Sequence, residues 1–195
     1  MKRTRLYAML AAVAVFLAAC GVNSIPTAEE NAKARWADVQ NNYQRRADLI
    51  PNLVATVRGA AAQERNVLRE VTEARASATR ITVSPEQLTD PNAVNRFAEA
   101  QSRLTLSLQR LQEAYPELRS NENFRDLQSQ IEGTENRITV ARRDYNAAVQ
   151  AYNTEIRTFP SVIGARVIYG SQPMAPYQAD AAAQRAPTVD FGNSQ

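Results

Sequence analysis

Apolar side chains recur at alternating steps of three and four residues along three long runs of the chain. The first run comprises Trp36, Val39, Tyr43, Ile50, Leu53, Val57, Ala60, Val67, Val71, Ala74 and Ala78, with Arg46 and Glu64 at two of its positions. The second comprises Val94, Phe97, Gln101, Leu104, Leu108, Leu111, Tyr115 and Leu118, and the third Phe124, Leu127, Ile131, Thr134, Ile138, Ala141, Tyr145, Ala148, Tyr152, Glu155 and Phe159. This spacing places each run on one helix face, and its strict alternation favours left-handed, coiled-coil-like packing. Because no alternating strand pattern bounded by turns accompanies these runs, we predict an all-α fold.

Caps and prolines divide the runs into three long helices. Side-chain oxygens that can accept the first amides of a helix, and prolines that start or end one, stand at each break. In chain order they are Thr27 with Glu30, Asp90 with Pro91, Ser120 or Asn121, and Pro160. Residues 161–170 then form one short final helix or turn. Because short connections make neighbouring helices antiparallel, we predict an antiparallel helical bundle over residues 27–168, built of three long helices and the short C-terminal helix.

The sequence RRADLIPNLV at residues 45–54 places a proline inside the first run. Ile50 faces the core in the helical register, so Pro51 lies one position round, toward solvent. Proline lacks the amide that would bond to the Ala47 carbonyl, and it bends a helix at that point. The unbroken apolar run on both sides favours a kinked helix. The alternative is a boundary, at which Asp48 caps a new helix.

Charged and amide side chains interrupt the apolar faces. Arg46 and Glu64 would lie about 27 Å apart along a straight helix, at about 1.5 Å per residue, so they cannot neutralise each other. Each charge therefore needs its own solution. The side chain extends its charged end to solvent, belongs to a polar layer that fixes helix register, or lines a partner-binding groove. Arg45, Arg75 and Gln101 are further polar positions for which we predict a structural or partner-facing role.

The N-terminal segment predicts export and lipidation. Residues 1–19 combine basic residues with an apolar run too short to span a bilayer comfortably, as in a secretory signal peptide. Leu17–Cys20 resembles the lipobox of bacterial lipoproteins, in which the cysteine is acylated; the alternative is an ordinary buried thiol. We predict that Cys20 binds membrane lipid and that residues 20–26 are a tether. Gly21 resembles an outer-membrane sorting signal, so in a host with two membranes the bundle faces the periplasm.

The C-terminal segment, residues 169–195, shows no helical period. It is rich in Ala, Gln and Pro, which is typical of a flexible tail. Its last apolar stretch, APTVDF at residues 186–191, is an exception. This stretch docks back on the bundle, adds as a strand to a partner, or is a frayed terminus.

Charge and composition exclude several classes of function. The chain has 23 Lys plus Arg against 20 Asp plus Glu, but three of the basic residues lie in the signal peptide. The mature protein is therefore close to neutral, and we expect no nucleic-acid partner. No histidine is present, and the single cysteine is the predicted lipid acceptor. His or Cys metal sites, Ser-His-Asp triads and Cys nucleophiles are excluded, and we expect no cofactor.

Several segments together resemble the LemA family of bacterial envelope proteins. They are RRADLIPNLVATVRG at 45–59, Glu64, VTEARA at 71–76, and the segment from AYPELRS to RTFP at 114–160. The resemblance covers about residues 30–170 and extends to the final PTVDF. It implies an antiparallel four-helix bundle in the envelope and carries over no catalytic residues. Members of the family commonly keep an uncleaved N-terminal membrane helix, whereas this chain has a lipobox.

Three functions are compatible with such a chain. The first is a non-enzymatic, lipid-anchored scaffold or protein-interaction module with an envelope protein as partner. The second is a ligand or metal carrier that uses the carboxylates of Glu64, Glu132 and Glu135, although di-metal bundles usually add histidines. The third is hydrolysis of an envelope polysaccharide by two carboxylates. The sequence leaves the oligomeric state open, a homo-oligomer included.

Overall fold

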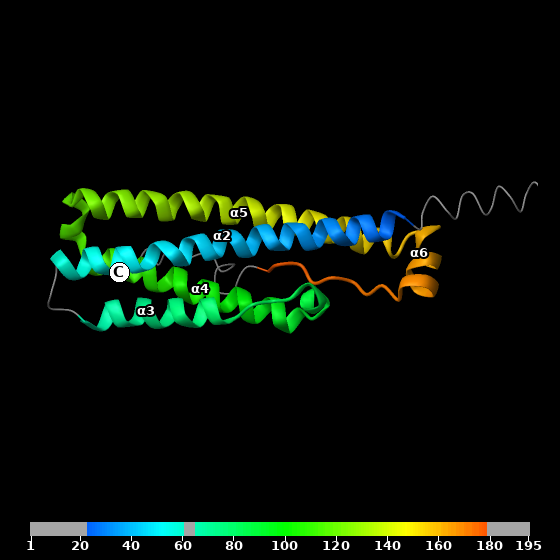
Figure 1. Cartoon of the computed structure of the whole chain (residues 1–195), viewed down its shortest axis with the longest axis horizontal. Helices are drawn as coiled ribbons and strands as arrows, with labels where there is room; N and C mark the ends of the chain where they lie inside the picture. Colours follow the sequence, from blue (N-terminus) through cyan, green and yellow to red (C-terminus); the bar gives the residue numbers. More distant parts are fainter. Residues whose placement is uncertain (1–22, 61–64, 179–195) are drawn as a thin grey trace, which may run out of the picture.

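The computed structural model describes residues 23–60 and 65–178 of the 195-residue chain. Its elements, in chain order, are α2 (Ser24–Ala60), α3 (Arg65–Arg80), η1 (Pro85–Thr89), α4 (Pro91–Ala114), η2 (Pro116–Ser120), α5 (Glu122–Glu155), α6 (Ser161–Gly164) and η3 (Ala165–Tyr169). η1 and η2 are 3₁₀ turns, and η3 is a π-helical turn. Every regular element within these residues is helical (Figure 1), so the predicted all-α fold is confirmed.

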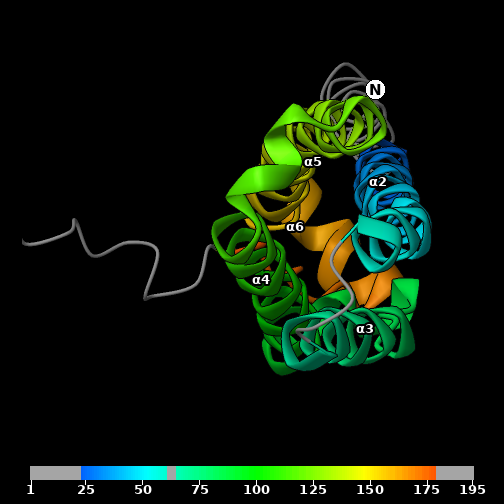
Figure 2. The same ribbon diagram turned by 90° about the vertical axis from the view of Figure 1, so that its left-hand side faces the viewer.

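Four helices, α2 to α5, form the bundle, and each runs antiparallel to the next (Figures 1 and 2). α2 packs chiefly against α5, and α3 against α4. The prediction of three long helices is therefore wrong in one respect, because its first helix is two helices, α2 and α3, that run in opposite directions. Ala60 and Glu64 keep the three-four spacing, so the apolar pattern continues across the reversal and hides it. The short α6 lies at one end of the bundle and is not one of its four helices.

Side-chain caps define two of the three predicted helix starts. Asp90 accepts a hydrogen bond from Asn92 N at 2.9 Å at the start of α4, and Asn121 accepts one from Phe124 N at 3.1 Å at the start of α5. The capping box predicted at Thr27 is wrong. α2 begins three residues earlier, at Ser24, so the last residues of the predicted tether are helical.

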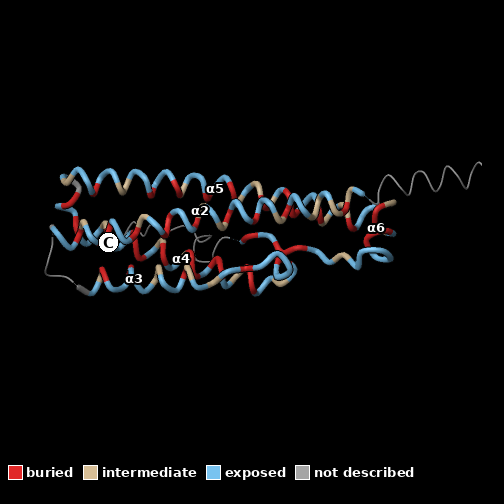
Figure 3. Tube along the Cα trace, viewed as in Figure 1, coloured by how far each residue is buried: buried red, intermediate tan, exposed pale blue. Residues whose placement is uncertain are grey.

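The inner faces of the helices pack into two apolar clusters placed end to end along the bundle (Figure 3). Trp36 and Tyr145 belong to the first cluster, Leu53 and Leu108 to the second, and none of the four side chains is more than 5% exposed. Where the structure describes the side chains of the three predicted apolar faces, all are buried or half-buried except Phe159. Phe159 is 81% exposed because α5 ends before it and the chain leaves the helical register.

Pro51 lies inside α2, which continues to Ala60, so the alternative of a helix boundary at this proline is wrong. The proline is exposed, as its register predicts. The carbonyl of Ala47, which a non-proline amide at position 51 would occupy, accepts a hydrogen bond from Arg75 Nε at 2.7 Å. Arg75 therefore supplies from α3 the donor that α2 lacks, and it ties the two helices together.

The helices of the bundle differ in length, and the C-terminal segment compensates for the difference. α2 and α5 have 37 and 34 residues, whereas α3 and α4 have 16 and 24. At about 1.5 Å per residue, α2 and α5 are about 50 to 55 Å long, but α4 is only about 36 Å and α3 about 24 Å. α3 and α4 therefore leave part of the inner face of the α2–α5 pair uncovered.

Residues 171–178, which we call the strap, extend along this uncovered part (Figures 1 and 3). Met174, Ala175 and Tyr177 of the strap are buried and belong to the first apolar cluster. The structure thus differs from the predicted flexible tail, because its first part is packed. The APTVDF stretch and its alternatives lie outside the described residues.

Candidate functional site

Two asparagines of α5 hold the strap in a groove that is lined by α2 and α5. Asn146 Nδ2 donates to Tyr177 O at 3.0 Å, and Tyr177 N donates to Asn146 Oδ1 at 2.8 Å. Asn153 makes the same pair of hydrogen bonds with Met174, both at 2.9 Å. Each amide side chain therefore pairs with a backbone N–H and C=O, much as an adjacent β-strand would.

The spacing of these contacts matches the geometry of the two partners. The asparagines are seven residues apart on a helix, which is about 10.5 Å at about 1.5 Å per residue. Met174 and Tyr177 are three residues apart, which in an extended chain at about 3.4 Å per residue is about 10 Å. The α5 face is thus suited to an extended backbone, and these contacts do not depend on the side chains that the backbone carries.

Tyr177 supplies the largest side chain of the strap. Its ring centroid lies 6.4 Å from Trp36 and 6.3 Å from Tyr43, and its hydroxyl lies 2.7 Å from the Tyr43 hydroxyl. The Arg142 guanidinium lies 4.3 Å from the centre of the Tyr177 ring, a cation–π contact. Burial raises the pKa of both tyrosines and so favours their neutral phenol forms. The groove therefore includes an aromatic pocket with a neutral polar end.

Further hydrogen bonds fix the strap between these contacts. Ala175 N donates to Leu88 O of η1 at 2.8 Å, and Tyr145 Oη donates to Ala175 O at 2.8 Å. Sequence reasoning missed this site. The available signal was the dipeptide Tyr-Asn, which occurs at residues 145–146 and again at 152–153. Tyr145 and Tyr152 follow the apolar period of the core, whereas Asn146 and Asn153 lie beside that period.

A polar layer lies between the two apolar clusters. Arg46 is 1% exposed, and its Nη1 donates to Thr105 Oγ1 at 2.9 Å and to Glu135 Oε2 at 2.8 Å. Its Nη2 donates to Gln101 O at 3.2 Å and to Gln101 Oε1 at 3.0 Å. Gln101 Nε2 in turn donates to Ala78 O at 3.3 Å. The layer joins all four helices, so sliding any one of them by a turn would break at least one of its bonds, and sliding α2 or α4 would break several.

The structure brings together some of the polar residues selected from the sequence. Arg46 and Gln101 meet in the polar layer, and for Arg46 this excludes the alternative of a stem that reaches solvent. Arg75 bonds to the Ala47 carbonyl, and Arg45 is exposed on α2. Cys20 and Glu64 lie outside the described residues.

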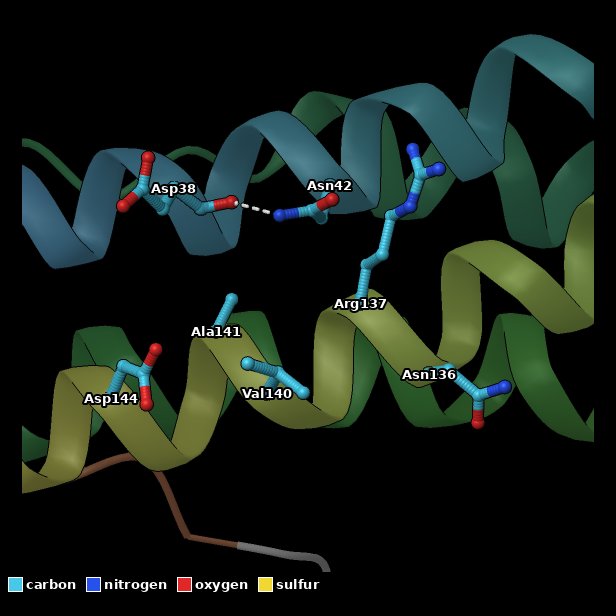
Figure 4. Close-up of a pocket in the computed structure, with 7 residues that line it drawn as sticks. All are labelled: Asp38, Asn42, Asn136, Arg137, Val140, Ala141 and Asp144. Carbon is cyan, nitrogen blue, oxygen red and sulfur yellow. Dashed lines mark hydrogen bonds between the residues drawn. The ribbon is translucent and has the colours of Figure 1, made fainter.

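A second hollow, of about 420 Å³, lies between α2 and α5 on the outer face of the bundle (Figure 4). Its carboxylates, Asp38 and Asp144, come from opposite helices, and Arg137 extends from α5 toward α2. Asp38 pairs with Arg35 at 3.5 Å and Asp144 with Arg143 at 3.1 Å, each on its own helix. Each carboxylate is thus paired with an arginine of its own helix.

Two of the three carboxylates considered for a metal site are engaged in other contacts. Glu135 pairs with Arg46, and Glu132 accepts a hydrogen bond from Gln128 at 3.0 Å. Across residues 23–60 and 65–178, no group of three or more His, Cys, Asp or Glu side chains is arranged to hold a metal ion. Within the same ranges, no helix combines the length and apolar character needed to cross a membrane.

The fold and the site define an elongated, antiparallel four-helix bundle that holds an extended polypeptide segment in a groove. The chain belongs to the LemA family, whose profile matches residues 35–191. Two similar relatives are the magnetosome proteins MamQ 1 and MamQ 2 of Paramagnetospirillum magneticum. Each is 26% identical over 161 residues, which cover 71% of this chain and 58% of the relative. The chain thus spans less than two thirds of their length.

Membership of this family indicates a membrane-associated protein of the bacterial envelope. Neither the family nor these relatives is known for an enzymatic activity. The matched range includes both groove asparagines, the strap and the final PTVDF.

Proposed function

We propose that the chain is a lipid-anchored, non-enzymatic scaffold of the bacterial envelope that binds extended polypeptide segments in the groove now filled by its strap. The observation that carries this proposal is the pairing of Asn146 and Asn153 with the backbone of Tyr177 and Met174. Because this pairing involves only backbone N–H and C=O groups of the strap, the groove suits other extended segments that place an aromatic side chain in the pocket beside Trp36.

The strap acts as the resident occupant of the groove. It is covalently attached, so a partner segment has to compete against its high effective concentration. A partner therefore binds when the strap is released or when its own anchoring side chain fits better. The partner is an envelope protein with an exposed extended segment, or the strap of a second copy of this chain.

Membrane association is supported by the family, and lipid anchoring by the lipobox-like sequence at Leu17–Cys20. Acylation of Cys20 would hold the bundle at a bilayer. In a host with two membranes, Gly21 supports attachment to the outer membrane, with the bundle facing the periplasm. In cell fractionation, Cys20→Ser should move the protein from the membrane to the soluble fraction without changing its helical circular dichroism. Unchanged membrane retention of this variant would refute lipid anchoring.

Binding in the groove is tested with Trp36, the only tryptophan of the chain. In full-length Tyr177→Ala, the pocket beside Trp36 loses its occupant, so the indole emission should shift to longer wavelength. A synthetic peptide of residues 170–178 should reverse this shift in a saturable way.

Two controls make the result specific. The same peptide with alanine in place of Tyr177 should have no effect, and Asn146→Ala with Asn153→Ala in the Tyr177→Ala protein should abolish the response. If the tyrosine peptide never reversed the shift, or if the asparagine variants responded equally, the groove would not be a site for free segments.

A further inference from the structure

One end of the bundle, residues 156–170, carries a concentration of exposed apolar side chains, and we call it the tip. Seven large hydrophobic side chains are exposed in the described part of the chain, and five belong to this short segment. These five are Phe159, Ile163, Val167, Ile168 and Tyr169, and Phe159 and Val167 are 81% and 80% exposed. The other two, Leu106 and Val140, lie singly on α4 and α5. A patch of this kind usually marks a surface that another apolar phase covers.

The tip is a fixed structure and presents these side chains outward. Ala165 is 1% exposed and packs in the first apolar cluster. Ser171 N donates to Ala165 O at 2.9 Å, and Gly170 closes the π-helical turn in the left-handed region at φ 58°. Glu155 accepts hydrogen bonds from Ser161 in the tip and from Ser24 at the start of α2. The base of the tip is therefore packed and hydrogen-bonded, while its apolar residues point away from it.

The tip lies at the end of the bundle where α2 begins (Figure 1). Ser24 is only four residues after Cys20, which at about 3.5 Å per extended residue is at most about 14 Å. A lipid on Cys20 would thus hold the start of α2 within this distance of the bilayer surface, with the tip at the same end of the bundle. The inference that follows rests on the proposed anchoring in this respect.

The charge of the tip fits the same surface. Arg157 and Arg166 are exposed, and residues 156–170 contain no Asp or Glu. Arginines that flank apolar side chains can bond to anionic headgroups while the apolar groups enter the interface. A second copy of this chain is a less suitable partner for the tip, since two copies anchored in one membrane would direct their tips at the bilayer and not at each other.

We propose that the tip is a membrane-contacting surface, at which Phe159, Ile163, Val167 and Ile168 enter the interfacial layer of a bilayer that contains anionic lipid. The lipid on Cys20 and the tip then give two points of attachment. With two points the bundle is held upright, and its groove stands at a fixed height above the membrane.

The test uses full-length, processed protein reconstituted into vesicles of phosphatidylethanolamine and phosphatidylglycerol. Acylation blocks Cys20, the only native cysteine, so an environment-sensitive bimane label attaches uniquely to Ile163→Cys. Leu106→Cys is the matched control, because Ile163 and Leu106 are 57% and 52% exposed but only Ile163 is in the tip. Brominated phospholipids should quench the label at 163 several-fold more strongly than the label at 106. Replacing phosphatidylglycerol by neutral lipid should weaken this quenching.

Flotation of the same vesicles separates the two proposals. If the protein floats with the vesicles but both labels are quenched equally weakly, the membrane-contacting tip is refuted while anchoring stands. If the label at 163 is shielded from a water-soluble quencher but not reached by brominated lipid, the tip contacts a second copy and this inference is likewise overturned. If the protein does not float, anchoring and the membrane-contacting tip both fail.

Discussion

The two asparagine pairs allow a quantitative prediction for release of the strap. Asn146→Ala removes two hydrogen bonds, of 3.0 and 2.8 Å, and leaves the Tyr177 amide and carbonyl without these partners. An unsatisfied buried backbone group costs about 1 to 3 kcal/mol; because Asn146 is only half-buried, we take the lower end, about 2 kcal/mol for the pair. At about 1.4 kcal/mol per factor of ten, the strap should open about 30-fold more often.

Amide hydrogen exchange measures this opening directly. The Ala175 amide of the strap, whose acceptor Leu88 O is kept in every variant, should lose protection by about 30-fold in Asn146→Ala, and adding Asn153→Ala should bring the total loss to about 1,000-fold if the two sites are additive. Asn42→Ala is the control, because Asn42 is also half-buried but bonds only to Asp38 O within α2. Unchanged protection of the Ala175 amide in the double variant, or an equal loss in the control, would refute the role of the asparagines.

Four further predictions concern stability. Arg75→Ala should lower the free energy of unfolding by about 1 to 2 kcal/mol when Pro51 is present, but clearly less in a Pro51→Ala background, where the new amide can bond to the Ala47 carbonyl. Equal costs in the two backgrounds of this double-mutant cycle would contradict the role of that carbonyl. Arg46→Ala should cost about 1 to 3 kcal/mol in chemical denaturation, because it leaves the buried Gln101 side chain without its donor, whereas Glu135 still reaches solvent; a cost near zero would exclude a structural role for that layer. Ile50→Asp buries an unpaired charge and should unfold the bundle, which an unmoved thermal transition would disprove. Two serine hydroxyls lower the pKa of Glu155 from 4.5. The contribution of Glu155 to the free energy of unfolding is therefore complete above pH 4.5 and is lost as the pH falls through the lowered pKa. Glu155→Gln should remove this part of the acid dependence of the thermal midpoint.

The helices and their buried faces were predictable because they follow from local spacing. Trp36, Leu53, Leu108 and Tyr145 recur with the helical period, and each is buried as that period requires. Arg46 was recognised as an interruption of this pattern. Its partners were not predictable, because Thr105 and Glu135 come from other helices and only the packing of α2 against α4 and α5 brings them close.

Two features escaped sequence reasoning for physical reasons. The reversal between α2 and α3 leaves the three-four spacing intact, so periodicity cannot distinguish one long helix from two helices of a hairpin. The strap has no period of its own, since an extended segment held by Asn146 and Asn153 needs no amphipathic pattern. The need for such a segment arises only once α3 and α4 are seen to be shorter than α2 and α5.

The central claim, that the strap occupies the α2–α5 groove in the cell, is tested most directly by photo-crosslinking at its anchoring residue. Full-length protein with p-benzoylphenylalanine in place of Tyr177 would be irradiated in intact cells and the products mapped by mass spectrometry. We predict an intramolecular crosslink to α2 between Trp36 and Tyr43, and a smaller fraction joined to partner chains that grows when Asn146 and Asn153 are replaced by alanine. Crosslinks that avoid α2 and α5 altogether would contradict the account.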